Sequence, residues 1–270
     1  MAHDLQARYA KLVDEKYRAT LTTKDNVIFN TKYEGSPTAG VVKIAVPNEI
    51  EVRDYDRENG GSLTASSTSY ITVEINEDIY INEKVDYADA AAVPYDVIAN
   101  KLDDGAYSMA LTTDTRGLNV LATEGTKMEN TAELTKSTVY DEIVNARTAL
   151  SKAKVPTKDR WLEVAPDTLA LLLKNSEFIK ACDLGQKILE TGAVGQIAGF
   201  NVYEAVNLGE KVAFIAGHPS AATRIEEWAV QPKVQSLDGE KYVGACAIQG
   251  RKVLKHKVIK PEGVVVRTIA

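Results

Sequence analysis

The sequence predicts an α+β fold, in which helices and strands do not follow a regular strand–helix–strand alternation. Three observations predict it. Residues 95–113 and 138–153 carry apolar side chains at helical spacing. Residues 41–82 hold two strand-like runs around a polar middle that contains glycine. Residues 228–269 then read as several strands separated by glycines.

The composition is that of a soluble globular protein with one large or two modest domains. The chain has 270 residues, of which 44% are hydrophobic and 26% charged. No apolar run approaches the roughly 20 residues that cross a bilayer, and the first residues do not resemble a signal peptide. We therefore expect a protein without a membrane span that is made and kept in the cytosol. A net charge of −6 disfavours nucleic-acid binding through phosphate neutralisation.

Common catalytic and cofactor-binding motifs are absent from the sequence, including phosphate-binding loops, dinucleotide fingerprints, serine-hydrolase elbows and zinc-protease helices. The histidines are scattered: His3, His218 and His256. His218 lies near Ser220 without a recognisable third partner, so we interpret it as a loop residue. Cys182 and Cys246 form no paired motif and are interpreted as core thiols. We expect no catalytic residue, cofactor or metal site.

The N-terminal segment is predicted to be an amphipathic helix over residues 4–21. Its apolar stripe consists of Leu5, Tyr9, Leu12, Val13 and Tyr17. An isolated helix of this length is marginal in water, so the stripe should dock on its own domain or on a neighbouring subunit. Residues 22–40, which contain glycine and proline, are interpreted as an extended connector.

A long β-hairpin is predicted over residues 41–82, with a polar tip near 54–69. On its returning strand, alternate residues are apolar: Ile71, Val73, Ile75, Ile79 and Ile81. A two-stranded ribbon is barely stable alone, so this pattern suggests that another molecule covers it. This is the first indication of assembly.

Charge is segregated along the chain. Residues 41–90 contain four basic and eleven acidic residues, a net charge of −7. Residues 241–270 contain seven basic residues and one acidic residue, a net charge of +6. The complementarity suggests pairing between subunits, with two unrelated solvated faces as the alternative.

The remaining elements follow in order along the chain. A helix over 95–113 begins after Pro94 and contains Gly105, which should lower its stability. A second helix begins at the N-cap residue Thr138. The elements predicted after it are a strand at 160–164, a helix at 166–173, a loop with Gly192, Gly195 and Gly199, strands at 200–206 and 212–216, a short helix at 219–227, and strands broken at Gly239, Gly250 and Gly263.

Several segments are similar to the major capsid proteins of tailed bacteriophages, the Hong Kong 97-type fold. The most similar segment is 139–166, where the run from Val139 to Pro156 and the following Arg160-Trp-Leu-Glu-Val-Ala-Pro166 resemble the helix, turn and strand that open the axial domain. Gly192-Ala-Val-Gly-Gln-Ile-Ala-Gly-Phe-Asn-Val-Tyr203 is similar to the family's glycine-rich loop and next strand. Ala216-Gly-His-Pro-Ser-Ala221 resembles the segment that follows. The resemblance spans most of the chain.

The resemblance implies an architecture for each part of the sequence. The parts would be an N-terminal arm at 1–40, an extended loop at 41–90, a spine helix and peripheral domain at 91–136, an axial domain at 137–226, and peripheral-domain strands with the C-terminus at 227–270. The spine helix itself would end near residue 116. The implied protein is a coat protein whose pentamers and hexamers form an icosahedral head around double-stranded DNA, without sequence-specific binding. It would be located in the virion, after synthesis and assembly in the cytoplasm of the bacterial host.

Contacts between subunits are expected at two places. On the extended loop they are Arg53, Asp54, Tyr55, Asp56, Arg57 and Glu58, and on the arm they are the apolar stripe residues named above. Some family members cross-link a loop lysine to a neighbouring asparagine. Lys43 and Lys84 do not lie at the tip, so we expect noncovalent closure. Because only a short arm precedes the predicted fold, a separate scaffolding protein is the expected partner, together with portal and decoration proteins.

Two alternatives remain open at this point. An encapsulin-type compartment has the same fold and would use an N-terminal helix to bind a cargo peptide. A soluble enzyme of unrecognised mechanism would instead be a monomer or small oligomer with a deep pocket lined by perturbed carboxylates.

Overall fold

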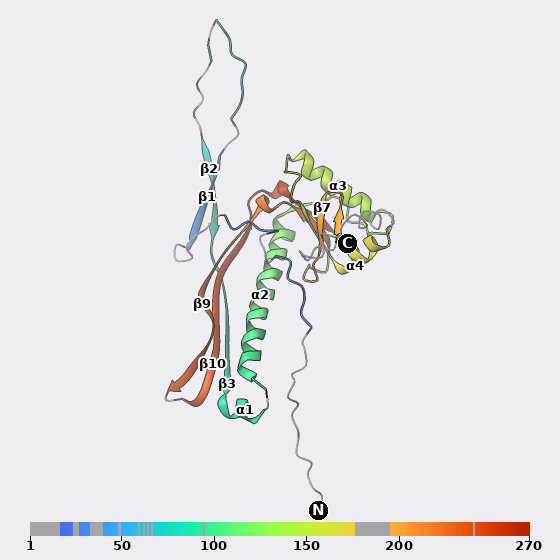
Figure 1. The fold of residues 1–270 in the computed structure, drawn as a ribbon. Helices are drawn as coiled ribbons and strands as arrows, with labels where there is room; N and C mark the ends of the chain where they lie inside the picture. Colours follow the sequence, from blue (N-terminus) through green and yellow to red (C-terminus); the bar gives the residue numbers. More distant parts are fainter. Residues whose placement is uncertain are drawn as a thin grey trace, which may run out of the picture.

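Three sheets and one long helix organise the chain in the computed structural model (Figure 1). The structure describes residues 17–23, 27–32, 40–47, 50–58, 60, 61, 63, 65, 67–93, 95–175, 195–239 and 241–270. The elements are β1 (Val41–Pro47), β2 (Thr68–Glu74), β3 (Glu77–Asp86), α1 (Tyr87–Ala92), α2 (Val97–Glu124), β4 (Thr126–Lys127), α3 (Val139–Lys152), β5 (Trp161–Val164), α4 (Pro166–Leu173), β6 (Gly195–Ile197), β7 (Phe200–Glu204), β8 (Val212–Gly217), the 3-10 turns η3 (Pro219–Ala221) and η4 (Pro261–Gly263), β9 (Ala222–Gly239), β10 (Tyr242–Val258) and β11 (Val264–Thr268).

One half of the molecule is elongated and consists of the antiparallel sheet β3-β10-β9 packed along α2 (Figure 1). Ile79, Met109 and Leu254 form one apolar cluster between the sheet and the helix. Val85, Cys246 and Ile248 form another near α1. Cys246 is a free, buried thiol, as predicted, whereas Cys182 lies outside the described residues. None of the described helices is long and apolar enough to cross a membrane.

The other half is a six-stranded sheet with the order β4-β11-β8-β5-β7-β6. Apolar residues of α3 and α4 cover one face, where they pack on Leu162 and Val164 of β5. Leu118 and Leu121 of α2 and the N-terminal residues Ile28 and Phe29 cover the other face, against Trp161. Because both faces are covered, β5 is buried along its whole length.

The long helix α2 extends beyond its predicted end at residue 113 and reaches Glu124. The side chain of its N-cap, Asp96, accepts a hydrogen bond from the backbone N–H of Ala99. Beyond Met109, its buried positions include Thr113, Asp114 and Gly117. These residues are polar or small, so the second half of the helix has no simple apolar stripe.

The predicted hairpin is divided between two sheets. β1 pairs with β2 from Val41↔Glu74 to Pro47↔Thr68, which ends the hairpin at residue 74 rather than 82. The apolar residues Ile79 and Ile81 belong to β3, which pairs with β10. The alternation of apolar and polar residues along 71–81 therefore does mark extended strands. These residues, however, belong to two strands, β2 and β3, which pair with different partners.

Two predictions for the C-terminal third are wrong. Residues 219–227 form a single 3-10 turn followed by the start of β9, because Ala222 to Val258 pair as one long antiparallel ribbon. Gly250 does not interrupt β10, although the register shifts beside it between Gln249 and Arg251. A Cβ atom at Gly250 would lie 3.2 Å from Ile81, so the glycine allows close approach. In addition, β11 joins the six-stranded sheet instead of remaining with β9 and β10.

The opposite charges of the two segments meet within one chain. Arg251 donates to the carboxylate of Asp78 from Nε and Nη2, and Lys255 binds Glu77 at 3.2 Å. These pairs join β10 to β3. Part of the charge complementarity that suggested pairing between subunits therefore joins strands inside the subunit.

Two glycines of α2 should respond oppositely to alanine substitution. A Cβ at Gly117 would lie 3.0 Å from Phe29 and 3.2 Å from His256, both fully buried. A Cβ at Gly105 would meet only the end of the flexible Ile81 side chain. We expect Gly117→Ala to destabilise the fold by about 1–3 kcal/mol through overpacking, and Gly105→Ala to be neutral or stabilising by up to about 1 kcal/mol. Urea unfolding of both variants checks this, and equal effects would contradict it.

His256 should make the fold sensitive to acid. Burial, and then the positive charge of Arg224, lower the pKa of His256 to about 4. In the unfolded chain the pKa is about 6.5, so the unfolded state binds the additional proton between these values. The contribution of His256 to stability is complete above about pH 6.5 and should fall by about 3 kcal/mol as the pH drops to about 4. Unfolding of His256→Leu at a series of pH values should show a smaller acid loss than the wild type, and parallel profiles would contradict the assignment.

Candidate functional site

The β1–β2 hairpin projects away from both halves of the molecule (Figure 1). Its base is attached to the molecule, because Ile44 and Val73 are buried against Ile225 and Ile259. Ile75 and Gly40 close the base through a backbone hydrogen bond of 2.9 Å. The stem is therefore held in place while the tip extends into solvent.

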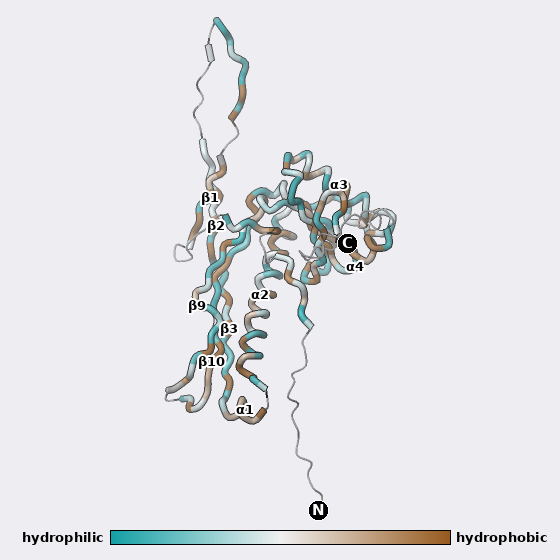
Figure 2. The backbone as a smooth tube through the Cα atoms, viewed as in Figure 1, coloured by the Kyte–Doolittle hydropathy of each residue, from teal (hydrophilic) through white to brown (hydrophobic). Residues whose placement is uncertain are grey.

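The projecting tip carries apolar side chains that the subunit leaves uncovered. Ile50, Val52 and Leu63 are 91%, 93% and 103% exposed. Figure 2 shows hydrophobic residues along this part of the loop, far from either core. Burying each such side chain is worth about 1.5–3 kcal/mol, so the tip is suited to pack on another molecule.

All six predicted loop residues, 53–58, lie together at this tip and are exposed. Arg53 forms an ion pair of 2.7 Å with Glu51 of the same loop. Asp56 organises the turn, since its carbonyl accepts from the N–H of Gly60 and its carboxylate accepts from the N–H of Glu58, both at 2.9 Å. Sequence reasoning identified the charged turn but did not single out the apolar residues on either side of it.

The arm differs from its prediction where the structure describes it. Leu5, Tyr9, Leu12 and Val13 lie outside the described residues, and Tyr17 is 106% exposed. Residues 17–21 are not helical, so the predicted helix does not reach residue 21. This stretch instead follows α2 in an irregular conformation.

Polar contacts hold the arm on α2. Arg18 pairs with Asp103 at 2.5 Å and stacks over the ring of Tyr107, whose hydroxyl accepts from the N–H of Ala19 at 2.7 Å. Farther on, Ile28 and Phe29 are completely buried between α2 and the six-stranded sheet. The sequence placed these two residues in a connector, because two apolar residues in a polar stretch show no periodicity.

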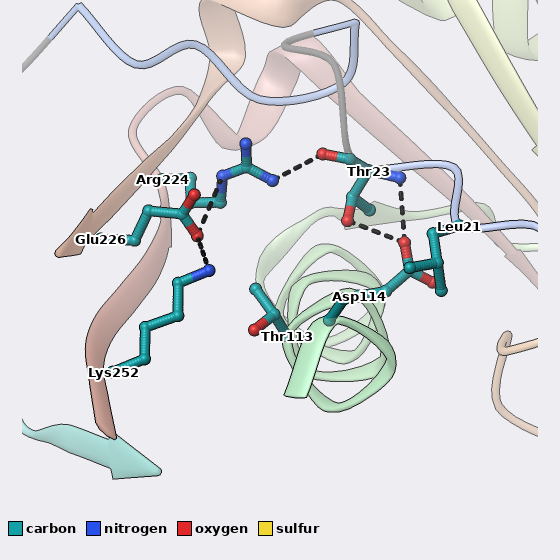
Figure 3. A pocket seen from close by; sticks show the side chains of 8 residues that line it. Leu21, Thr23, Thr113, Asp114, Arg224, Glu226 and Lys252 are labelled. Carbon is teal, nitrogen blue, oxygen red and sulfur yellow. Dashed lines mark hydrogen bonds and ion pairs between the residues drawn. The ribbon is translucent and has the colours of Figure 1, made fainter. Parts of the chain in front are cut away.

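A small polar cavity of about 90 Å³ lies where the arm, α2, β9 and β10 meet (Figure 3). Glu226 binds Lys252 at 2.7 Å, and Arg224 donates to the carbonyl of Thr23 at 2.6 Å. Figure 3 shows these side chains joined to one another around the cavity, so we interpret it as a junction that ties the arm to the body. Within the described ranges, no group of three or more His, Cys, Asp or Glu side chains could hold a metal ion.

The His218–Ser220 pair forms a local cap. The N–H of Ser220 donates to Nδ1 of His218 at 3.1 Å, and the two side chains lie 2.7 Å apart. Burial lowers the pKa of His218. This geometry stabilises the turn η3 and agrees with the interpretation of His218 as a loop residue. Trp161 is fully buried in the core.

Comparisons with known proteins identify the fold. No protein-family model and no curated protein matches the sequence. A structure from Mycobacterium phage Che8 superposes with a TM-score of 0.80 at 25% identity, covering 97% of this chain and 96% of that one. The capsid of cyanophage P-SCSP1u gives 0.78 at 12% identity over 98% and 93%. A virus-like particle from Pyrococcus furiosus gives 0.59 at 15% identity over 92% of both chains.

These matches span nearly the whole chain and define a class of shell-forming folds. The chain has the Hong Kong 97-type fold, in which helices and sheets are combined as the α+β prediction required. More particularly, the structures it is similar to include phage capsids, which confirms the resemblance found in the sequence.

Proposed function

We propose that this chain is the major capsid protein of a tailed bacteriophage, which assembles into the icosahedral head and encloses double-stranded DNA. The similarity to phage capsids over nearly the full length supports a shell protein. The observation that carries the proposal is the anchored hairpin whose apolar tip projects into solvent. A subunit with such a projection gains stability when a neighbouring copy covers it.

The geometry of that contact is suited to assembly. In this proposal the tip packs on a different patch of the neighbouring copy, so the contact is heterologous and closes into rings or shells rather than continuing as an open filament. Many modest contacts then add up in a closed particle. A net charge of −6 fits an inner wall that does not bind the enclosed DNA tightly.

Each part of the fold takes a role in this proposal. The β1–β2 hairpin is the extended loop, α2 is the spine helix, the β3-β10-β9 sheet forms the peripheral domain, and the six-stranded sheet with α3 and α4 forms the axial domain. Residues 53–58 and the arm would contact other subunits. Lys84 lies on β3 over the ring of Tyr242, away from the hairpin tip, which supports noncovalent closure. Scaffolding, portal and decoration proteins would be the partners, with the virion as location.

An encapsulin-type compartment is the second candidate, because the Pyrococcus furiosus virus-like particle has a similar fold. Its TM-score is lower than those of the phage structures, so it is the less supported reading. The enzyme hypothesis required an accessible perturbed carboxylate. Glu163 has a pKa raised well above its usual value, but it is fully buried between the six-stranded sheet and α2.

Negative-stain electron microscopy with size-exclusion chromatography tests the proposal. The chain should be expressed alone and then with a candidate scaffolding protein. We expect closed shells, or tubes and sheets of pentameric and hexameric rings. DNA inside would support the phage head and an enclosed enzyme would support the compartment. A stable monomer or dimer under both conditions would overturn the assembly function.

A further inference from the structure

One carboxyl group inside the fold has no partner to justify its burial. Glu163 is 0% exposed on β5, and neither of its carboxyl oxygens has a hydrogen-bond partner. Its neighbours in the sheet are Tyr203 on β7 and Ile215 on β8. Burying a charge under these conditions is strongly unfavourable, so the group should be held in its neutral form.

The groups around Glu163 come from four other parts of the chain: the arm, α2, β7 and β8. Burial raises its pKa well above the usual range; the hydroxyl of Thr22 on the arm opposes this shift, and the negative charge of Asp114 on α2 adds to it. The Thr22 hydroxyl is buried but does not reach hydrogen-bond geometry. On β7, burial raises the pKa of Tyr203, and a negative charge on Glu163 would raise it further. The apolar Ile215 completes the surroundings.

Asp114 also holds the arm directly. One of its oxygens accepts from the N–H and the hydroxyl of Thr23, at 2.9 and 2.8 Å, and the other accepts from Asn207 at 2.8 Å. On the other side of Thr23, Arg224 binds its carbonyl and lies near Glu226, which also binds Lys252. The segment 21–23 is thus attached at Asp114, next to Glu163.

Of the elements around Glu163, the arm can move with the smallest loss of packing free energy. β5, β7 and β8 belong to the central sheet, and moving any of them would open both cores. Residues 17–23 are instead attached to α2 mainly through polar contacts, which are exposed at the Arg18 pairs and buried between Thr23 and Asp114. If Glu163 ionises, lifting this segment is the shortest way to bring water to the carboxylate.

We propose that Glu163 is a proton-controlled latch for the N-terminal arm, which keeps residues 21–23 on α2 while it is protonated and releases them when it loses its proton to solvent. Since the closed form binds one proton more than the open form, the open population should increase by up to about tenfold per pH unit until Glu163 is ionised in the closed form. The role of this latch in shell assembly rests on the proposed function, whereas the latch itself is a property of the subunit.

Hydrogen exchange of peptides covering residues 17–23 tests the latch in the full-length chain between pH 6 and pH 9. Wild type, Glu163→Gln and the control Glu210→Gln, which alters an exposed carboxylate, should be compared at each pH. The ratio of rates between variants at one pH removes the intrinsic pH dependence of exchange. We expect the wild type and the control to exchange progressively faster than Glu163→Gln as the pH rises, by tenfold or more across the range.

A constant ratio between wild type and Glu163→Gln across the range would overturn the proposal, as would an equal increase across all core peptides, which would indicate global unfolding. If Glu163→Gln does not fold, Glu163→Met provides an apolar side chain of similar length and should show the same loss of pH dependence. The readout does not require particles. Hydrogen exchange that does not change with pH between the variants therefore refutes the latch alone. Failure to form shells refutes only the proposed function.

Discussion

Replacing Val52 and Leu63 by aspartate is expected to abolish shell formation while leaving the subunit folded. Both side chains are almost fully exposed on the hairpin tip, so aspartate does not disturb packing within the subunit. At the proposed interface it would bury two charges without partners, at several kcal/mol for each contact. The contact is repeated at every subunit, so even a modest loss prevents closure.

Electron microscopy and sedimentation measure whether the variant forms shells. Circular dichroism and urea unfolding measure whether its subunit remains folded. The matched control is Val52→Ile with Leu63→Met, which keeps the tip apolar and should assemble normally. Arg53→Glu with Arg57→Glu should impair assembly without unfolding the subunit, but less completely, because Arg53 already pairs with Glu51 in its own loop. Normal particles from the aspartate variant would remove the tip from the interface.

Phe29→Ala should destabilise the subunit by about 3–5 kcal/mol. The ring is fully buried, belongs to the same cluster as Trp161 and Leu118, and lies 4.9 Å from the ring of His256. Alanine would leave a cavity between α2 and the six-stranded sheet and would weaken the attachment of the arm. Equilibrium urea unfolding measures the change.

The control for this substitution is Tyr17→Ala, on the same arm but completely exposed, which should change stability by less than about 0.5 kcal/mol. Similar small effects for both variants would show that residues 27–30 are not part of the core. A large effect of Tyr17→Ala in the isolated subunit would contradict the conformation described for the arm.

The sequence predicted well those elements whose pattern is complete over a short window. The helix from Thr138, the strand near 161–164 and the helix from Pro166 all form where they were expected. Their signals are an apolar stripe, a continuous apolar run and a proline at a helix start, each readable within one element. The turn at Ala198 and Gly199, both with positive φ, likewise joins β6 and β7 within the expected glycine-rich loop.

Prediction failed where a neighbour decides the conformation. Residues 222–227 pair with residues 253–258 of β10, and this pairing overrides a local pattern that looked helical. The end of α2 buries Thr113, Asp114 and Gly117 because the arm, His256 and Asn207 meet it there. No feature near these residues in the sequence indicates those partners.

For the candidate site, too, the sequence indicated some residues and gave no sign of others. The exposed charged turn at 53–58 was visible in the sequence, since polar residues and glycine between two strands indicate a projecting loop. The buried Glu163 was not visible, because a single glutamate in a strand usually faces solvent. It is buried only because α2 and the arm cover that face of β5.

By itself the sequence determined the α+β class, the positions of most elements and the projecting loop, since these follow from side-chain periodicity and turn chemistry over a few residues. Only the tertiary structure decided that β3 leaves the hairpin for β10, that Phe29 enters the core and that Asp78 and Glu77 meet their cations within one subunit. These outcomes depend on which distant segments pack together, because the free energy of burial and charge pairing is set by neighbours in space rather than in sequence.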